Sequence, residues 1–355
     1  MRLFTCQHCG QLLYFENVTC ESCGHALGYL PEQGTVSALK LAGDGTWQAL
    51  AAPGRSFVPC ANLAHGVCNW QLDAADSDDY CLACRHNRTV PDPAIPENLL
   101  RWRKLEVAKH RLMYTILKLG LPHPTETEDE GRGLAFDFLA DPPSGDAPKV
   151  MTGHDDGLIT IALVEADDVE RERRRTALGE PYRTLLGHLR HEVGHYYWDR
   201  LVAEGGDLEG FRALFGDERE DYGEALQRHY ANAQPDSWSD SYVSAYARAH
   251  PWEDWAETWT HYLHIVDTLE TARAFRLRVD PKAARNDNLS AEVDFDVYAD
   301  VPIATLIDAW LPLSFAINSL NRSMGQNDAY PFVLSSGVIE KLAFVHRVVH
   351  GVRPA

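Results

Sequence analysis

Two histidines separated by three residues form the part of this sequence best suited to chemistry. In the segment His191-Glu192-Val193-Gly194-His195, both imidazoles would lie on one face of a helix, one turn apart. Both rings can then bind a single metal ion, and Glu192 can take a proton from water that the metal activates. This HExxH pattern is typical of zinc-dependent peptidases. Because the chain contains 16 histidines, such a match can also arise by chance, and its meaning depends on the rest of the sequence.

A catalytic zinc ion needs a third protein ligand and keeps one open position. Glu253 and Glu257 lie four residues apart in a segment that also contains three tryptophans. Carboxylates in such aromatic surroundings are costly to bury unless they are paired or bound to a metal. Glu253 is therefore our candidate for the third ligand. The competing candidates are three neighbouring histidines: His250, His261 and His264.

All eight cysteines precede residue 85, and they form two sets of four. The first set consists of two Cys-x-x-Cys-Gly motifs: Cys6, Cys9, Cys20 and Cys23. The two-residue gap in each motif turns both thiolates toward one ion, and glycine tolerates the turned backbone that follows. The two motifs together match a zinc ribbon. The alternative, a pair of redox-active motifs, lacks the βαβ pattern that accompanies such motifs in thioredoxin-like proteins.

The second set suits another four-cysteine zinc site: Cys60, Cys68, Cys81 and Cys84. The seven-residue gap between the first two is unusual. His65 or His86 could replace one thiolate, but we interpret both as exposed loop histidines. A zinc ion enclosed by four thiolates has no open coordination position, so we expect both cysteine sites to be structural. Between the two sets, residues 35–57 alternate apolar and polar side chains around turn signals, which predicts short strands.

The charge and the hydropathy of the sequence disfavour several classes of function. The formal net charge of −19 repels phosphate backbones and disfavours general binding of nucleic acid. The first residues contain no apolar run typical of a signal peptide, and no stretch of about 20 apolar residues predicts a membrane span. These features predict a cytoplasmic protein. In that reducing compartment, clustered cysteines indicate metal binding rather than disulfides.

The predicted elements place the motifs in an α+β protein. Three prolines between residues 91 and 96 mark a boundary, so we predict a double zinc-binding module over residues 1–90 and a mainly helical domain over 91–355. In the second domain we expect a helix over 97–119 and strands over 133–139 and 157–164. The HExxH helix should span 181–203, with Pro181 in its first turn. Further helices are expected over 241–249, 252–269, 303–320 and 332–349, the last two as a C-terminal cap.

Taken together, these motifs resemble a bacterial family of zinc-binding metallopeptidases over most of the chain. HExxH followed by a distant ExxxE is similar to the gluzincin branch, a zincin-like arrangement. This resemblance implies that Glu253 binds zinc and that Glu257 accepts a hydrogen bond from a zinc-binding histidine. A tyrosine seven residues before Glu253 is similar to the anthrax lethal factor type of site, which implies that Tyr246, or alternatively Tyr242, stabilises the oxyanion. In related zincins an edge strand aligns the substrate, and residues 157–164 are the candidate here.

The sequence therefore predicts a zinc metallopeptidase that hydrolyses a peptide or isopeptide amide bond, with Glu192 as general base. It would hold one catalytic and two structural zinc ions, act on a protein or peptide, and offer the zinc-ribbon module to a protein partner. One alternative is a non-catalytic zinc-binding interaction protein, although such a protein gains nothing from Glu192. Another is a protease linked to DNA, which the net charge disfavours.

Overall fold

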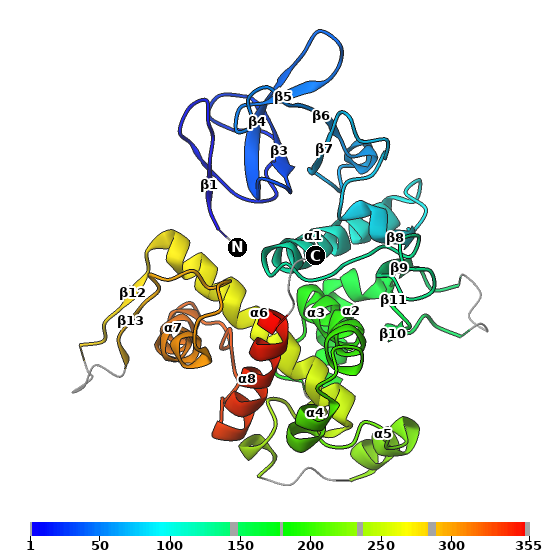
Figure 1. Cartoon of the computed structure of the whole chain (residues 1–355), viewed down its shortest axis with the longest axis vertical. Coiled ribbons are helices and arrows are strands. Elements are labelled where there is room, and N and C mark those ends of the chain that lie inside the picture. Colours follow the sequence, from blue (N-terminus) through cyan, green and yellow to red (C-terminus); the bar gives the residue numbers. More distant parts are fainter. Residues whose placement is uncertain (1, 143–147, 178–179, 233–236, 283–288, 352–355) are drawn as a thin grey trace. The chain divides into compact units, whose positions relative to one another are not determined.

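The computed structural model describes residues 2–142, 148–177, 180–232, 237–282 and 289–351 (Figure 1). Contacts between residues divide the chain into two compact units. Unit 1 consists of Met1–Lys118 and Pro122–Arg174, and unit 2 of Leu119–Leu121 and Arg175–Ala355. Sheets dominate the first part of the chain and helices the rest, which confirms the α+β prediction.

Unit 1 begins with a small hairpin and a five-stranded antiparallel sheet. The hairpin pairs β1 (Phe4–Thr5) with β2 (Leu12–Leu13). The sheet has the order β3-β4-β5-β6-β7, with strands Ala26–Leu30, Thr35–Leu41, Trp47–Ala49, Ser56–Pro59 and Gln71–Asp73. Its core contains Leu30, Leu39, Ala49 and Phe57. The strands predicted over 35–57 are therefore present.

A second sheet and a long helix complete unit 1. The sheet has the order β10-β11-β9-β8, with strands Gly153–Asp155, Leu158–Ala162, Ala135–Leu139 and Asn87–Thr89. Strand β11 pairs with β10 on one side and with β9 on the other. The prediction of a substrate-aligning edge strand over 157–164 is thus wrong, because both of its edges are already hydrogen-bonded. Helix α1 (Pro96–Lys118) agrees with the predicted helix over 97–119. Short 3-10 turns η1 (Ala61–His65) and η2 (Cys84–His86) precede and follow β7, and the 3-10 turn η3 (Leu163–Ala166) and helix α2 (Asp168–Ala177) follow β11 along the chain.

Unit 2 is organised around two packed helices, α3 (Leu185–Trp198) and α6 (Pro251–Phe275). Their close approach depends on Gly194, because a Cβ atom there would lie 3.1 Å from the Cα atom of Ala256. The indole of Trp255 donates a 2.7 Å hydrogen bond to the carbonyl of Gly194. Helix α3 begins after Thr184, whose hydroxyl accepts from Gly187 N at 3.0 Å. Pro181 therefore lies before the helix, and the prediction that it lies in the first turn is wrong.

The remaining elements of unit 2 surround this pair. They are the π-turn η4 (Asp199–Ala203), α4 (Leu208–Phe215), α5 (Tyr222–Ala231), η5 (Trp238–Asp240), η6 (Tyr246–Arg248), β12 (Arg278–Val279), β13 (Ala291–Glu292), α7 (Ile303–Ser323) and α8 (Ser336–Gly351). The helix predicted over 241–249 is only the single turn η6. Ser244 shortens it, because its hydroxyl accepts a hydrogen bond from Ala247 N at 3.1 Å and so replaces a helical bond.

Helix α7 bears on the prediction that no segment could span a membrane. By length and composition alone, α7 could span a membrane, so the prediction that no segment could do this is contradicted. Its side chains Leu306, Trp310 and Leu313 are buried in unit 2, and the core helix of a globular protein passes the same test. The helix is therefore weak evidence for a membrane span, and the cytoplasmic location stays a prediction.

Candidate functional site

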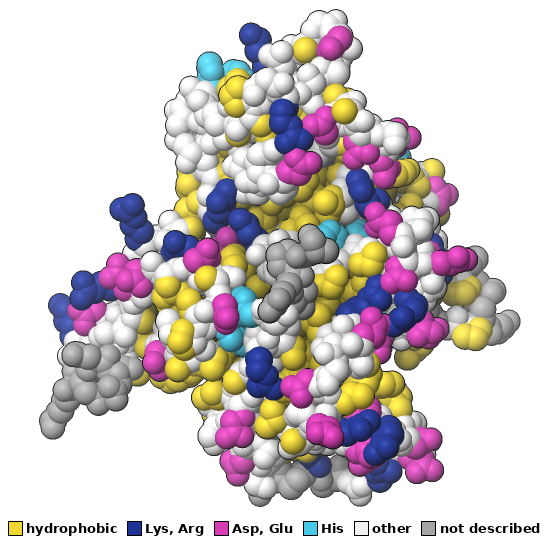
Figure 2. Space-filling model, viewed as in Figure 1, with side chains coloured by type: hydrophobic (Ala, Val, Ile, Leu, Met, Phe, Trp, Pro, Cys, Tyr) yellow, Lys and Arg dark blue, Asp and Glu magenta, His cyan; other side chains and the backbone are white. Residues whose placement is uncertain are grey.

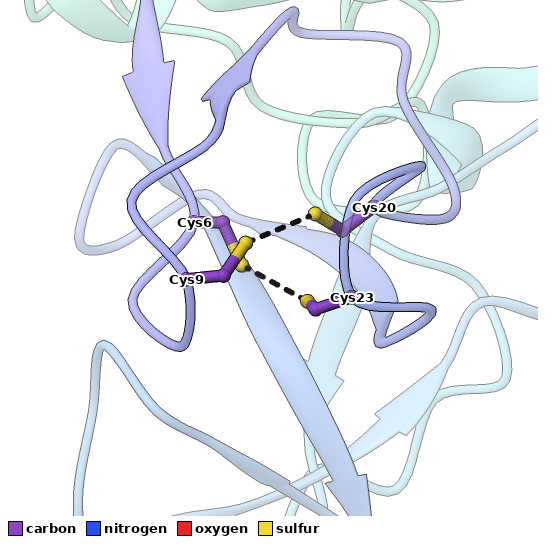
Figure 3. Close-up of side chains that lie close together, drawn as sticks. All are labelled: Cys6, Cys9, Cys20 and Cys23. Atoms are coloured by element: carbon purple, nitrogen blue, oxygen red, sulfur yellow. Dashed lines mark hydrogen bonds between the residues drawn. The ribbon is translucent and has the colours of Figure 1, made fainter.

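The first four cysteines converge on one point in unit 1 (Figure 3). Their sulfur atoms all lie within 4.8 Å of one another, with Cys6 Sγ 3.7 Å from Cys23 Sγ and Cys9 Sγ 3.6 Å from Cys20 Sγ. No disulfide joins any of the eight cysteines. Four thiolates at about 2.3 Å from a zinc ion would stand roughly 3.8 Å apart. The four side chains thus fit a tetrahedral zinc ion.

The glycine after each motif has the conformation that this turn requires. Gly10 and Gly24 adopt φ angles of 79° and 75°, a region that other residues rarely enter. Each donates its backbone N–H to the carbonyl of the first cysteine of its motif, at 2.9 and 2.8 Å. These turns direct both thiolates of each motif inward.

The second cysteine group is buried and includes a side chain that the sequence did not reveal. Its four sulfur atoms also lie within 4.8 Å of one another. His110, on α1, places Nε2 3.4 Å from Cys68 Sγ and 3.7 Å from Cys84 Sγ, while its Nδ1 donates to the carbonyl of Glu106 at 2.7 Å. A histidine held in this way presents Nε2 to a metal or its ligands. No spacing signal links His110 to Cys84, which lies 26 residues earlier.

Neither histidine proposed as a substitute for a thiolate has that role. The prediction that His86 is exposed is wrong: it is buried, and its Nδ1 donates to the carbonyl of Leu134 at 2.8 Å. The ring of His65 lies 5.7 Å from the ring of Trp102. In the described part of the chain, neither belongs to a group of side chains that could hold a metal.

A third group of possible ligands lies in unit 2, between α3 and α6. His191, His195 and Glu253 each direct one ligand atom to within 4.8 Å of the others. His191 Nε2 is 2.9 Å from Glu253 Oε2, and His195 Nε2 is 3.8 Å from Glu253 Oε1. The structure therefore brings together the two histidines of the HExxH motif and the carboxylate chosen as their partner.

Glu257 makes this geometry informative about a metal. Its Oε1 atom lies 2.8 Å from His191 Nδ1, so in the neutral ring that nitrogen donates and Nε2 presents a lone pair to Glu253. The buried Oε2 atom of Glu253 accepts no hydrogen bond from the described residues. A lone pair and a carboxylate oxygen 2.9 Å apart repel each other unless a cation or a proton lies between them. The donor set therefore fits a zinc ion.

The pKa values of Glu253 and His191 also favour a positive charge between these two side chains. Burial acts to raise the pKa of Glu253, but the facing rings of His195 and His191 outweigh it and lower the pKa to about 2. Burial acts to lower the pKa of His191, and Glu253 and Glu257 instead raise it well above its ordinary value. Glu253 is therefore ionised, and a positive charge is stabilised beside it.

Two tyrosines border the third group. The Tyr246 ring is 6.0 Å from the His191 ring, and burial, followed by the charge of Glu253, raises the pKa of its hydroxyl. Tyr222, on α5, donates a 2.7 Å hydrogen bond to Glu253 Oε1. The sequence did not reveal Tyr222, which lies 31 residues before Glu253. Tyr242 is the alternative to Tyr246. The ammonium nitrogen of Lys341 lies over its ring, 4.2 Å from the ring centroid.

The other predicted side chains have the following positions. Glu192 is half-buried on α3, and its charge acts on the Tyr222 hydroxyl. Each histidine that competed with Glu253 has another partner: His250 Nδ1 accepts from Trp252 N at 3.1 Å, His261 bonds to the Tyr330 hydroxyl at 2.7 Å, and His264 bonds to Arg190. Among the described residues, none of the three belongs to the group at Glu253.

Comparisons with known proteins agree with zinc chemistry. A family described as "Putative zinc-binding metallo-peptidase" matches residues 98–348, and a family described as "zinc-ribbon domain" matches residues 3–95. Uncharacterized proteins of Mycobacterium bovis and of two strains of Mycobacterium tuberculosis are each 44% identical to this chain over 357 residues. The alignments cover 100% of this chain and 97% of each relative. No solved structure matches. The chain therefore belongs to this zinc-binding metallo-peptidase family and carries an N-terminal zinc ribbon.

Proposed function

We propose that the chain is a gluzincin-like zinc metallopeptidase that hydrolyses peptide or isopeptide amide bonds, with His191, His195 and Glu253 as ligands of the catalytic ion. The observation that carries this proposal is the 2.9 Å approach of Glu253 Oε2 to His191 Nε2. A bound zinc ion would supply Lewis acidity, which lowers the pKa of water toward about 7 and stabilises negative charge on the attacked carbonyl.

The surrounding side chains supply the remaining functions. Glu192 takes the proton of the attacking water and delivers it to the leaving amine. The Tyr246 hydroxyl stays protonated because its pKa is raised, so it can donate a hydrogen bond to the negative charge that develops on the carbonyl oxygen. Glu257 accepts the Nδ1 proton of His191 at 2.8 Å and so fixes which nitrogen faces the ion.

The two cysteine groups have a different role in this proposal. Each holds a structural zinc ion, because four thiolates leave no position for water or substrate. Figure 2 shows acidic and basic side chains mixed on the face drawn, without a broad basic area among its described residues. A zinc-ribbon module of this kind suits a protein partner better than nucleic acid.

The Glu192→Gln variant tests the proposed mechanism. It keeps the shape of the side chain but cannot take a proton, so zinc content should be unchanged and turnover of an unfolded protein or peptide library should be lost. Zinc is measured by elemental analysis and cleavage by mass spectrometry. Glu209→Gln is the matched control, because Glu209 is exposed on α4, and it should cleave normally.

Two results would contradict the proposal. Full activity of Glu192→Gln would exclude Glu192 as the base. Absence of cleavage by the zinc-loaded wild-type protein would favour the alternative, a non-catalytic zinc-binding protein that uses its N-terminal modules to bind a partner.

A further inference from the structure

A cavity of about 430 Å³ lies beside the candidate metal group in unit 2. Residues from α5, from η6 and from the start of α6 line it. The Tyr246 ring lies 6.0 Å from the ring of His191 and 6.0 Å from the ring of the cavity-lining His229. The cavity is therefore one layer of side chains away from the proposed zinc ligands, and its volume is in the range of ligand pockets.

The cavity contains a positive charge that the described chain does not balance. Arg248 lines it and is half-buried. Among the described residues, no carboxylate oxygen lies within 4.0 Å of its guanidinium group. The other lining arginine, Arg228, lies 3.2 Å from Glu220, which also lines the cavity, and 3.9 Å from Glu224. Arg228 and Glu220 thus offset each other, whereas Arg248 remains unmatched in a chain whose net charge is −19.

A second polar group in the cavity lacks a partner. His229 Nδ1 is buried and has no hydrogen bond to the described residues. Buried polar atoms are nearly always hydrogen-bonded, so an unpaired one indicates a missing partner. His229 and Arg248 both line the cavity. Burial lowers the pKa of His229, and the charge of Arg248 lowers it further. The cavity thus offers a planar cation, the Arg248 guanidinium group, beside the His229 ring.

We infer that this cavity binds a carboxylate group of the substrate, with Arg248 as its ligand. A guanidinium group matches a carboxylate in shape and can donate two parallel hydrogen bonds to it. The carboxylate belongs to an acidic side chain near the scissile bond or to the C-terminus of the substrate. This inference rests on the proposed peptidase function and adds a substrate class to it.

The test compares matched peptides with matched variants of the full, zinc-loaded chain. A peptide that the wild-type protein cleaves is prepared with Glu and with Gln at each position near the scissile bond, and each version with a free or an amidated C-terminus. Arg248→Met removes the cation, and Arg248→Glu reverses it. Arg219→Met is the control, because Arg219 is exposed, pairs with Asp217 at 2.7 Å and does not line the cavity.

We expect the wild-type protein to cleave the carboxylate form of one peptide pair about 10- to 100-fold faster, by kcat/KM, than its neutral form. Arg248→Met should remove this preference for the carboxylate form. Its kcat/KM for the neutral form should stay within about threefold of the wild-type value. Arg248→Glu should favour peptides with Lys at the same position. The pair that shows the ratio identifies whether a side chain or the C-terminus supplies the carboxylate.

The possible failures are distinguishable. Cleavage without preference for a carboxylate, or an equal loss on both forms in Arg248→Met, overturns the inference and leaves the proposed peptidase intact. Absence of cleavage by the wild-type protein on every peptide overturns the proposed function and, with it, the substrate class.

Discussion

A buried ion pair beside the candidate metal group gives the sharpest stability prediction. Lys341 Nζ, on α8, lies 2.6 Å from Asp254 Oδ2, on α6, and donates to the carbonyl of Ser241 at 2.7 Å. The two side chains are only 7% and 1% exposed. Asp254 follows Glu253 directly, so this pair fixes the turn of α6 that directs Glu253 toward His191.

Removing the cation should be costly. Lys341→Met keeps the apolar stem and leaves Asp254 as a buried, unpaired charge, which typically costs ~3–5 kcal/mol of folding free energy. Asp254 can escape part of this cost by taking a proton. Burial raises its pKa to about 7 even with Lys341 present, and without Lys341 the pKa must rise further.

This shift predicts a particular pH dependence. An acid whose pKa is raised in the folded state loses stability as the pH rises from its unfolded pKa to its folded pKa. In the wild-type protein, this loss of folding free energy ends near pH 7. In Lys341→Met it continues above pH 7, by up to ~1.4 kcal/mol per pH unit. The deficit of the variant relative to the wild type should therefore be larger at pH 8.5 than at pH 6.5.

Guanidinium denaturation of the zinc-loaded chain, followed by tryptophan fluorescence at both pH values, measures this deficit. The double variant Asp254→Asn/Lys341→Met removes both charges and should recover much of the loss at pH 8.5. Lys282→Met is the control, because Lys282 is exposed in the same unit, and it should change stability by less than ~0.5 kcal/mol. A deficit below ~1 kcal/mol at pH 8.5, or a double variant no more stable than the single one, would refute the reasoning.

Three further predictions concern single side chains. Glu257→Ala frees the Nδ1 atom of His191 and should weaken zinc binding at the histidine group ~10- to 100-fold, while both cysteine groups keep their zinc. Titration with a chelator of known affinity measures the zinc affinity. An unchanged affinity would exclude the orienting role of Glu257. Tyr246→Phe should lower kcat by ~10²-fold with little change in KM, as steady-state kinetics will show, and an effect on KM alone would indicate a role in binding. Burial lowers the pKa of His154 to about 4, and its Nε2 accepts from Gly157 N at 3.0 Å. His154 therefore contributes stability that is complete above pH 6.5 and is lost as the pH falls toward 4. Between pH 7 and 5, unfolding should show the wild-type protein losing ~2 kcal/mol more than His154→Gln; parallel curves would contradict this.

Local spacing predicts a site correctly where the ligands and the turn or helix that positions them lie in one short segment. The motif Cys6-Gln7-His8-Cys9-Gly10 contains its turn, because the glycine that allows the positive φ angle follows the second cysteine. The two histidines of HExxH share a helix face by periodicity alone. Such features need no knowledge of distant residues, so the sequence was sufficient to predict the first cysteine group and the shared helix face of His191 and His195.

Contacts between distant segments could not be predicted from local sequence patterns. His110 has no periodic relation to the cysteines it approaches, and Tyr222 stands on a short helix whose position depends on the packing of unit 2. Strand β11 has the apolar pattern of any buried strand, and that pattern cannot tell an internal strand from an edge. In each case the missing information is the pairing of elements, which arises from tertiary packing rather than from local preference.

The hydrogen bond from Tyr222 bears directly on how Glu253 can bind a metal ion. Oε1 of Glu253 accepts from the tyrosine hydroxyl at 2.7 Å, and Oε2 faces His191 Nε2 at 2.9 Å. A carboxylate that shares its charge in this way offers one oxygen to an ion rather than two. Two imidazoles and one oxygen leave a tetrahedral ion with an open position. That count distinguishes the histidine group from the two cysteine groups, each of which offers four thiolates, and it is why catalysis is proposed at the histidine group alone.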